Sequence, residues 1–495
     1  MKITHTTASE GWQGSEMAFF GIFEDGAWPQ ALLELDKQLG GELGRMAKKA
    51  EFTGASGQSF SLSPKLAKDY LRVELSGLGK AEDLLEESLL EMAGRAAAAA
   101  RGSSVSKLYL SVALIEGRDA RLAIYHLALG VELGDYRFTL YKKEKKERKK
   151  LEVILGTNEV QRGDAGELIA RAAVVASAVV EARDLANRGA NDLTPLRLAD
   201  HAREYLRGSG VRVQVLNEKE LVKEKMNLHL AVGSGSKNSP CLIHMVLKSK
   251  GAKSGRRVFI IGKGITFDSG GISLKPGPGM EDMKMDMSGA AAVICAIRAL
   301  GKLGVDCEVH ALVAAAENMP DGKSYRPGDV IASREGKTVE ILNTDAEGRL
   351  TLADAVSWAQ DHGATEIIDL ATLTGACLIA LGPNCAALFS NDEGQTQALL
   401  AAAGRAGEQF WKMPLDRRLR KQLDSDVADI KNIGTKHGGT ITAALFIGDF
   451  VKKGLSWAHM DIAGPAMVGE NKGHIKKGGS GFGVATLIEY LAPLG

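Results

Sequence analysis

The sequence has few cysteines, and they are not arranged in pairs. Among its 495 residues only five are cysteines, namely Cys241, Cys295, Cys307, Cys377 and Cys385. Their number is odd and none belongs to a Cys-x-x-Cys pair, which excludes a disulfide framework and a zinc knuckle as the basis of the fold. We expect reduced thiols in the core of a cytosolic protein.

The chain also lacks an excess of charge of either sign. It has 62 Lys and Arg against 61 Asp and Glu, so the formal net charge is +1. This balance gives no overall attraction to nucleic acid or to an anionic membrane surface. A local basic run, YKKEKKERKK at 141–150, is diluted by Glu144 and Glu147. We interpret it as a solvated segment between domains, with an added nucleic-acid-binding role as the alternative.

No apolar run is suited to crossing a membrane, which takes about 18 or more predominantly apolar residues. The longest uncharged stretch, 370–391, is interrupted by Gly382-Pro383-Asn384. The first residues, MKITHTTASEGW, have neither the basic nor the apolar region of a signal peptide. We therefore expect a soluble cytoplasmic protein without a membrane partner.

Several widespread catalytic motifs are absent too. There is no HExxH of single-zinc proteases and no GxSxG of serine hydrolases. Two Gly-Lys-Ser/Thr strings lack the first glycine of a phosphate-binding loop, because Ile331 and Glu317 stand in its place. Gly262 and Gly264 begin a GxG, but Phe267 replaces the third glycine of a dinucleotide-binding turn.

What the sequence does have is glycine and a regular α/β pattern. Its 58 glycines against 12 prolines indicate many close backbone approaches in an ordered fold. We predict a smaller N-terminal α/β domain at 1–160 and a connecting helix and turn at 161–190. In the first domain the expected elements are strands at 19–23, 70–74 and 107–112 and a helix at 84–101.

Residues 191–495 are predicted to form a larger α/β catalytic domain with a central mixed sheet flanked by helices. Short apolar runs rich in β-branched residues are typical of central strands. They occur at 211–216, 258–261, 308–313 and 366–370, and helical patterns occur at 288–303 and 349–360.

Three segments of this second domain concentrate charge beside apolar elements. They are GKGITFDSGGISLK at 262–275, EDMKMDM at 281–287 and NTDAEGRL at 343–350. Each lies after a predicted strand or before a predicted helix, where open α/β sheets place their sites. A single aspartate there is normally a turn or capping residue, and a single lysine a surface residue. The coincidence of three such segments favours a shared site.

Together the segments supply four carboxylates and two amines: Asp268, Asp286, Asp345, Glu347, Lys263 and Lys275. Carboxylates that converge without cations repel one another, and buried charges persist only when paired or bound to metal. Two divalent ions would resolve the repulsion. Oxygen ligands suit Mn²⁺ or Mg²⁺, and also Zn²⁺. His310 and His459 lie in apolar strand-like contexts, and we interpret both as core residues.

The string NTDAEGRL, with GKGITFDSGG and MKMDMSGAAAV before it, closely resembles the leucine aminopeptidase (cytosol aminopeptidase) family. Further matching strings are ENMPDGKSYRPGDV (317–330), DLATLTGA (369–376), WKMPL (411–415), ADIKNIG (428–434), WAHMDIAGP (457–465) and GFGVATLIEYL (481–491). The resemblance runs from about residue 183 to the C-terminus. Residues 1–150 show only a compatible α/β pattern.

This resemblance implies a two-metal exopeptidase that removes N-terminal residues, preferentially leucine and other apolar ones, from peptides. By the resemblance, the tighter metal is held by Lys263, Asp268, Asp286 and Glu347. The more exchangeable metal is held by Asp268, Asp345 and Glu347, with the Asp345 carbonyl contributing. The metals implied are Mn²⁺ or Zn²⁺, with Mg²⁺ or Co²⁺ as further candidates. Burial beside two dications would free the Lys263 lone pair.

The same resemblance implies roles for the other residues. A hydroxide bridging the two metals is the expected nucleophile, and Lys275 would stabilise the oxyanion. Arg349, at the start of a helix, would seat a bicarbonate that acts as general base. Met283, Thr372, Gly375 and Ala463 match positions that line the substrate side-chain pocket. A homohexamer with active sites facing an interior cavity is also implied.

One rival hypothesis from the residues themselves is a two-metal phosphoesterase, because clustered carboxylates with two metals also serve phosphoryl chemistry. The substrate class, peptide or phosphate ester, and the need for a free α-amine distinguish the two.

Overall fold

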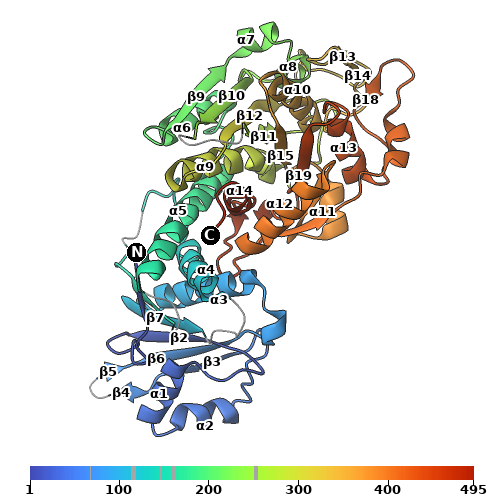
Figure 1. The fold of residues 1–495 in the computed structure, drawn as a ribbon. Helices are drawn as coiled ribbons and strands as arrows, with labels where there is room; N and C mark the ends of the chain where they lie inside the picture. Colours follow the sequence, from blue (N-terminus) through green and yellow to red (C-terminus); the bar gives the residue numbers. More distant parts are fainter. Residues whose placement is uncertain (67–68, 113–118, 145–147, 158–161, 250–254, 495) are drawn as a thin grey trace. The chain divides into compact units, whose positions relative to one another are not determined.

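The computed structural model describes residues 1–66, 69–112, 119–144, 148–157, 162–249 and 255–494. Their contacts divide the chain into two units (Figure 1), Met1–Ser177 with Glu470–Lys476, and Ala178–Gly469 with Lys477–Gly495. The division falls inside the long helix α5 (Arg162–Asn187), within the segment predicted to connect the domains. Each unit has a sheet flanked by helices, so the predicted two-domain α/β class is confirmed.

The first unit is built on a sheet of six strands whose spatial order is β1-β8-β7-β2-β6-β3. Their bounds are β1 Lys2–Thr6, β2 Met17–Ile22, β3 Ser59–Leu62, β6 Arg72–Gly77, β7 Lys107–Val112 and β8 Glu152–Gly156. All neighbours are parallel except β3 with β6. The helices are α1 Gln30–Gln38, α2 Glu42–Lys49, α3 Glu86–Gly102 and α4 Ala120–Gly134, and a short ribbon joins β4 Lys65–Leu66 to β5 Asp69–Tyr70.

The basic run at 141–150 was interpreted as a segment between domains, and that interpretation is wrong. The run lies between α4 and β8, and β8 pairs with β1 and β7 inside the first sheet. Its residues 145–147 fall outside the described part. Of the rest, Arg148 makes an ion pair with Asp135, at 2.7 Å. The predicted N-terminal domain, 1–160, already contained the run, so only its interpretation as a segment between domains fails.

The second unit contains an eight-stranded mixed sheet in the order β17-β16-β19-β15-β11-β12-β10-β9. The strands are β9 Val211–Leu216, β10 Cys241–Leu247, β11 Arg257–Asp268, β12 Glu308–Asn318, β15 Glu366–Ala371, β16 Cys385–Ser390, β17 Gln409–Lys412 and β19 Ser456–Asp461. The four central strands β19, β15, β11 and β12 run parallel, while β10 and β16 are antiparallel to their inner neighbours.

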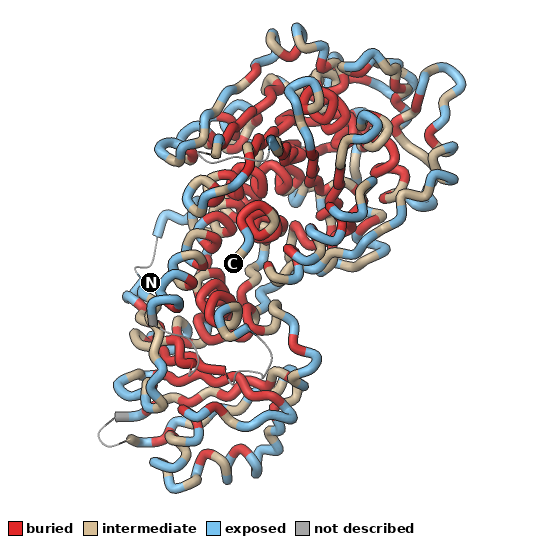
Figure 2. Tube along the Cα trace, in the orientation of Figure 1, coloured by how far each residue is buried: buried red, intermediate tan, exposed pale blue. Residues whose placement is uncertain are grey.

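Helices cover this sheet, and Figure 2 shows buried residues concentrated along it. The helices are α6 Pro195–Tyr205, α7 Glu218–Lys223, α8 Asn227–Gly233, α9 Ser288–Leu303, α10 Gly348–Asp361, α11 Gly375–Leu381, α12 Glu393–Ala406, α13 Gly439–Gly448 and α14 Val484–Leu491. Leu352 and Trp358 of α10 pack with Phe259 of β11 in one core cluster. Smaller sheets join β13 Val330–Ala332, β14 Thr338–Glu340 and β18 Ile430–Lys431, and β20 Met467–Val468 with β21 Gly478–Gly479.

Strand β11 is longer than the predicted 258–261, because the segment expected to be a loop continues the strand to Asp268. Its two glycines explain both the continuation and the misleading pattern. A Cβ at Gly262 would lie 2.5 Å from the carbonyl oxygen of Gly289 in α9, and one at Gly264 would lie 2.7 Å from Val313 Cγ1. Glycine is therefore required by close packing on the strand, not by a turn.

Other predictions about single residues are confirmed. All five cysteines are free, and four of them are buried as predicted, whereas Cys385 is only half-buried. His310 is buried and bonds His244 Nε2 through Nδ1 at 2.9 Å, and His459 is fully buried with its Nδ1 2.5 Å from Asp369 Oδ1.

Within the described ranges, the helices include none with the length and apolar character needed to cross a membrane.

Asp354, in the middle of α10, is expected to make stability depend on pH. It is fully buried and accepts hydrogen bonds from the backbone N–H groups of Arg334, at 2.8 Å, and His229, at 3.1 Å. Burial raises its pKa to about 7, although these hydrogen bonds act in the opposite direction. A raised folded-state pKa contributes stability below the unfolded value of about 3.9, and this contribution, roughly 4 kcal/mol, is lost as pH rises through about 7.

Asp354→Asn removes this ionisation, so its unfolding free energy is expected to fall less than that of the native chain between pH 4 and 8. Urea unfolding at several pH values measures the difference. Asp361→Asn, at the end of the same helix, is the control, because hydrogen bonds from Lys452 and Arg334 lower the pKa of Asp361 to about 2. Parallel curves for Asp354→Asn and the native chain would contradict the prediction.

Candidate active site

The central strands of the second sheet end at one edge, and the charged segments gather there. Because β19, β15, β11 and β12 are parallel, their carboxyl ends share that edge. Lys263 and Asp268 come from β11, Asn318 ends β12 and Asp461 ends β19. After β11, the next strand of this sheet in sequence is its neighbour β12. After β15, the next strand is β16, which lies in the other direction along the strand order, beyond β19. Such a switch point opens the crevice in which α/β sheets bind ligands.

Lys263 lies within β11 and its side chain is held from three directions. Its Nζ is 2.8 Å from Asp286 Oδ1 and 2.8 Å from Glu347 Oε1. It also donates a hydrogen bond of 2.9 Å to the carbonyl oxygen of Thr372. A Cβ at Gly348 would lie 2.6 Å from Lys263 Cε, so this glycine makes room for the lysine. Only 3% of the residue is exposed, which is unlike a surface lysine.

Two of its carboxylate partners come from helix starts. Asp286 follows the 3₁₀ helix η2 (Met280–Met285), just before α9, and accepts a hydrogen bond of 2.8 Å from Thr372 Oγ1. Glu347 directly precedes the first residue of α10. Both are buried, and the Oδ2 atom of Asp286 has no hydrogen-bond partner among the described residues.

Lys275 forms a second group of ion pairs, next to that of Lys263. Its Nζ is 2.9 Å from Asp268 Oδ2 and 2.5 Å from Asp345 Oδ1. The other oxygen of Asp268 accepts hydrogen bonds from the backbone N–H of Gly270, at 2.9 Å, and from Asn318 Nδ2, at 2.8 Å. Asp268 therefore stands between the two lysine–carboxylate groups.

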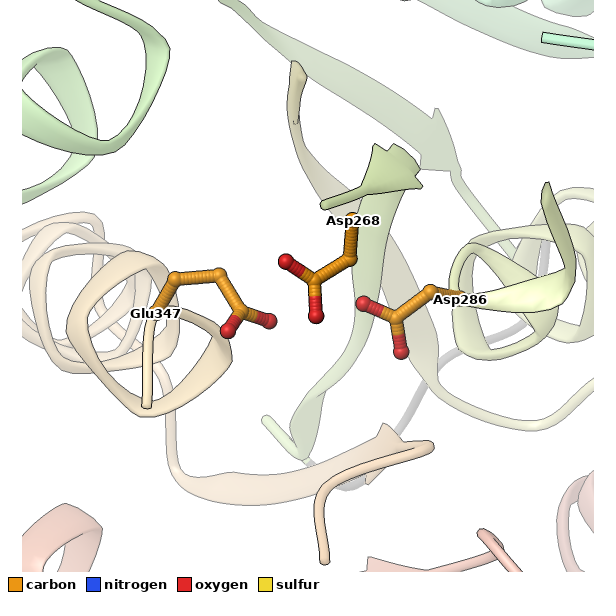
Figure 3. A group of neighbouring side chains, drawn as sticks. All are labelled: Asp268, Asp286 and Glu347. Atoms are coloured by element: carbon orange, nitrogen blue, oxygen red, sulfur yellow. The ribbon is translucent and has the colours of Figure 1, made fainter. Parts of the chain in front are cut away.

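Asp268, Asp286 and Glu347 each place one carboxylate oxygen within 4.8 Å of the other two. Figure 3 shows these carboxylates pointing toward one another from three different segments of the chain. All three residues are buried. Converging oxygens of this kind, one of them without a hydrogen bond, fit a divalent cation with a preference for oxygen ligands.

The pKa shifts of these residues also favour a bound cation. Burial raises the pKa of Asp286 well above its ordinary value, and Lys263 acts in the opposite direction. Burial and the charge of Asp268 raise the pKa of Glu347 and of Asp345. Burial lowers the pKa of Lys263, but its carboxylate neighbours more than offset this and the net shift is upward. The cluster thus carries more negative charge than burial tolerates, and additional positive charge would stabilise it.

A cavity of about 430 Å³ opens over the cluster. Every residue that the sequence analysis assigned to a metal, catalytic or pocket role lines it: Lys263, Asp268, Asp286, Asp345, Glu347, Lys275, Arg349, Met283, Thr372, Gly375 and Ala463. Apolar side chains complete one wall, among them Met285, Leu378 and Ile433. The cavity therefore combines a charged floor with an apolar wall, as binding sites for small ligands usually do.

The sequence model described as "Cytosol aminopeptidase family, catalytic domain" matches residues 180–488, and the one described as "Cytosol aminopeptidase family, N-terminal domain" matches residues 19–145. The chain belongs to the cytosol aminopeptidase family. It is a metal-dependent aminopeptidase, a hydrolase that acts on peptides. The second match also extends the family to the first unit, where the sequence strings alone had shown only a compatible pattern.

Relatives resemble the aminopeptidase over almost their whole length. The probable cytosol aminopeptidase of Alkaliphilus metalliredigens (strain QYMF) is 43% identical over 467 residues, which is 92% of each chain. That of Aquifex aeolicus (strain VF5) is 40% identical and covers 97% of this chain and 96% of the relative.

Two solved structures share the fold. A mutant of tomato leucine aminopeptidase has a TM-score of 0.90 at 34% identity, over 99% of this chain and 96% of that one. The bottromycin maturation enzyme BotP, in complex with Mn, has a TM-score of 0.85 at 35% identity, over 97% of this chain and 99% of that one.

Some residues that shape the aminopeptidase site were not singled out from the sequence. Asn318 is fully buried and donates from Nδ2 to Asp268 and also to the carbonyl oxygen of Thr344, at 3.0 Å. The hydroxyl of Tyr325 donates to the same carbonyl at 2.7 Å. Both lie in the string ENMPDGKSYRPGDV, which matched the family, but the string by itself says nothing about their partners.

Asp461, at the end of β19, was also missed. Its buried carboxylate accepts hydrogen bonds from Thr374 Oγ1 at 2.6 Å, from Leu373 N at 3.1 Å and from Ala463 N at 3.3 Å. Leu373, Thr374 and Ala463 all line the cavity. Asp461 therefore holds three residues of the cavity lining in place without lining the cavity itself.

Proposed function

We propose that this chain is a two-metal aminopeptidase that removes leucine and other apolar residues from the N-terminus of peptides. The observation that carries the proposal is the buried cluster of Asp268, Asp286 and Glu347, whose ligand oxygens lie within 4.8 Å of one another on the floor of the cavity. Membership in a family of aminopeptidases supplies the reaction class.

The proposed ligands of the tighter metal are Lys263, Asp268, Asp286 and Glu347, and those of the exchangeable metal are Asp268, Asp345 and Glu347. Their support is geometric, since Lys263 Nζ reaches two of these carboxylates at 2.8 Å, and Lys275 joins Asp268 to Asp345. Lys263 can donate its lone pair only as a neutral amine, and neighbouring dications favour that form. Mn²⁺ or Zn²⁺ is the proposed occupant, with Mg²⁺ and Co²⁺ as further candidates.

When bound, two divalent cations supply Lewis-acid activation of the peptide carbonyl and of the attacking water. Lys275 is the proposed stabiliser of the oxyanion that develops on that carbonyl. Burial lowers the pKa of Lys275, but Asp268 and Asp345 more than offset this, so its ammonium remains charged. It is the more exposed lysine of the two, with 22% of its side chain accessible against 4% for Lys263, and it lines the cavity.

Arg349 is the proposed seat of a bicarbonate ion, which would supply a general base for the attacking water. Its guanidinium lines the cavity and is buried, and its Nε has no hydrogen-bond partner among the described residues. Burial lowers its pKa to about 10, while Glu347 and Asp461 act in the opposite direction, so the side chain stays cationic at neutral pH. The cationic side chain at the cavity would attract such an anion.

The proposed pocket for the substrate side chain consists of Met283, Thr372, Gly375 and Ala463. No side chain is present at Gly375 to fill the space, and a Cβ there would meet nothing within 4 Å. Leu378, one turn further along α11, adds apolar surface to the same wall. A pocket of this composition favours leucine over charged residues.

Metal removal is the direct test. After chelation the protein is expected to lose hydrolysis of Leu-p-nitroanilide almost completely, and Mn²⁺ or Zn²⁺ is expected to restore it, because the buried carboxylates need the cations both for charge balance and for catalysis. p-Nitrophenyl phosphate serves as the control substrate for the phosphoesterase alternative. Activity that is unaffected by chelation, or hydrolysis of the phosphate ester alone, would contradict the proposal.

We further propose a homohexamer. Support comes from large apolar side chains that the single chain leaves exposed in the second unit, including Ile379 at 88%, Val427 at 68% and Leu274 at 61%. Burial of such side chains between subunits would remove them from water. Light scattering coupled to size exclusion is expected to give six times the 52.6 kDa chain mass, and a monomer at micromolar concentration would contradict the assembly.

A further inference from the structure

Asn432 lies outside the cavity but touches two of the segments that form it. It follows the short strand β18 and is fully buried. Its backbone N–H donates to the carbonyl oxygen of Glu340 at 3.0 Å, which anchors it beside β14. It lines no part of the cavity itself, so any influence on the reaction must pass through its neighbours.

The side chain of Asn432 makes hydrogen bonds with the backbone that precedes Asp345. Its Oδ1 accepts from the N–H of Leu342 at 2.9 Å and from that of Asn343 at 3.4 Å. Its Nδ2 donates to the carbonyl oxygen of Asn343 at 2.7 Å. Asn343 in turn accepts the Asp345 N–H on its own Oδ1, at 2.8 Å. An amide is needed here, because the contact uses an acceptor and a donor at once.

The backbone carbonyl of Asn432 also accepts a hydrogen bond from the guanidinium of Arg349. Arg349 Nη1 donates to the carbonyl oxygen of Asn432 at 2.8 Å. One buried residue therefore connects the segment of Asp345 to Arg349 through contacts of hydrogen-bond length. Arg349 Nε has no hydrogen-bond partner among the described residues, so the contact of Nη1 with Asn432 is a fixed point for the guanidinium.

We propose that Asn432 is a positioning residue, which fixes Arg349 relative to Asp345 during peptide hydrolysis. The inference rests on the proposed function, since it assigns Arg349 and Asp345 their roles from it. Rate depends steeply on such placement, and a displacement of about 1 Å can cost on the order of 10²-fold. Asn432 does not line the cavity, so its loss should act on kcat more than on KM.

The test compares Asn432→Ala and Asn432→Asp with Asn391→Ala. Asn391 is the control for the hydrogen bonding, because its side chain, although exposed, also bridges two backbone groups. It accepts from Trp457 N at 2.9 Å and donates to Leu455 O at 2.9 Å, at the opposite end of β19. Both Asn432 variants are expected to lower kcat on Leu-p-nitroanilide about 10- to 100-fold. KM and bound-metal content are expected to stay within about threefold, and the control within about twofold, of the native values.

A double-mutant cycle with Arg349→Ala separates positioning from general damage. If Asn432 acts through Arg349, Asn432→Ala costs at most about twofold in the Arg349→Ala background. Multiplicative losses, or a kcat of Asn432→Ala equal to that of the native protein, would overturn the inference.

Amide hydrogen exchange gives a readout that needs no activity. Asn432→Ala is expected to speed exchange at Leu342, Asn343 and Asp345 by about tenfold or more, while the amides protected in β11 stay unchanged. Unchanged exchange in the 342–345 segment overturns the inference even if the native protein proves inactive. Inactivity of the native protein on every aminoacyl substrate would instead overturn the proposed function.

Discussion

Replacement of Glu347 by glutamine is expected to lower kcat/KM for Leu-p-nitroanilide by about 10³-fold or more. Glutamine keeps the shape of the side chain but removes the charge. Glu347 is buried, reaches Lys263 at 2.8 Å and shares the acidic cluster with Asp268 and Asp286. In the proposal it binds both metals, whose Lewis-acid contribution is worth several kcal/mol, and about 4 kcal/mol corresponds to 10³-fold in rate.

Steady-state kinetics at saturating Mn²⁺, with metal content measured on the same samples, provides the check. Glu281→Gln is the control, since Glu281 is an exposed carboxylate at the start of η2, outside the cavity. The control is expected to retain full activity and metal. A Glu347→Gln variant within tenfold of the native kcat/KM would show that this carboxylate does not hold a catalytic metal.

Lys275→Ala is expected to lower kcat by roughly 10²- to 10³-fold with little change in KM, the usual cost of removing one oxyanion-stabilising group. Its ammonium sits between Asp268 and Asp345. Removal of this cation leaves the charges of both carboxylates uncompensated, so Mn²⁺ affinity is expected to hold or increase. Loss of rate with retained metal separates Lys275 from the proposed ligands, whose replacement weakens both.

Mn²⁺ titration by calorimetry, run beside the kinetics, measures the two effects independently. Lys323→Ala is the control, because Lys323 is an exposed lysine on the loop after β12 and does not line the cavity. If Lys275→Ala keeps kcat within threefold of the native value, the oxyanion role is wrong. If it loses metal along with activity, Lys275 supports the metal site and not the oxyanion.

Much of the fold could be read from local patterns, and the misses have local causes as well. Helix α9 has the predicted bounds, since an Ala-rich apolar run between Ser288 and Leu303 has few alternatives. Strand β11 was cut short at residue 261, because two glycines and a lysine inside a strand look like a loop. Strands β10 and β8 were not predicted, although each pairs with two neighbours.

The candidate site shows the same division. The candidate residues that the sequence analysis took from short, Gly-rich strings all line one cavity. Asn318, Asp461 and Asn432 were not found, because a buried asparagine or aspartate is recognisable only by its partners. Asn432 lies 89 positions from Asn343 in sequence, and Asp461 lies 87 from Thr374.

The sequence by itself therefore determined the class of the fold, the family and the set of ionisable groups available for chemistry. These properties reside in the identity of residues and in their spacing along short strings. Only the tertiary structure decided which oxygens converge, which lysine bridges which carboxylates, and which buried backbone carbonyl accepts a hydrogen bond from Arg349. The physical reason is that a parallel sheet brings distant strand ends to one edge, and the resulting contacts depend on packing that no local pattern encodes.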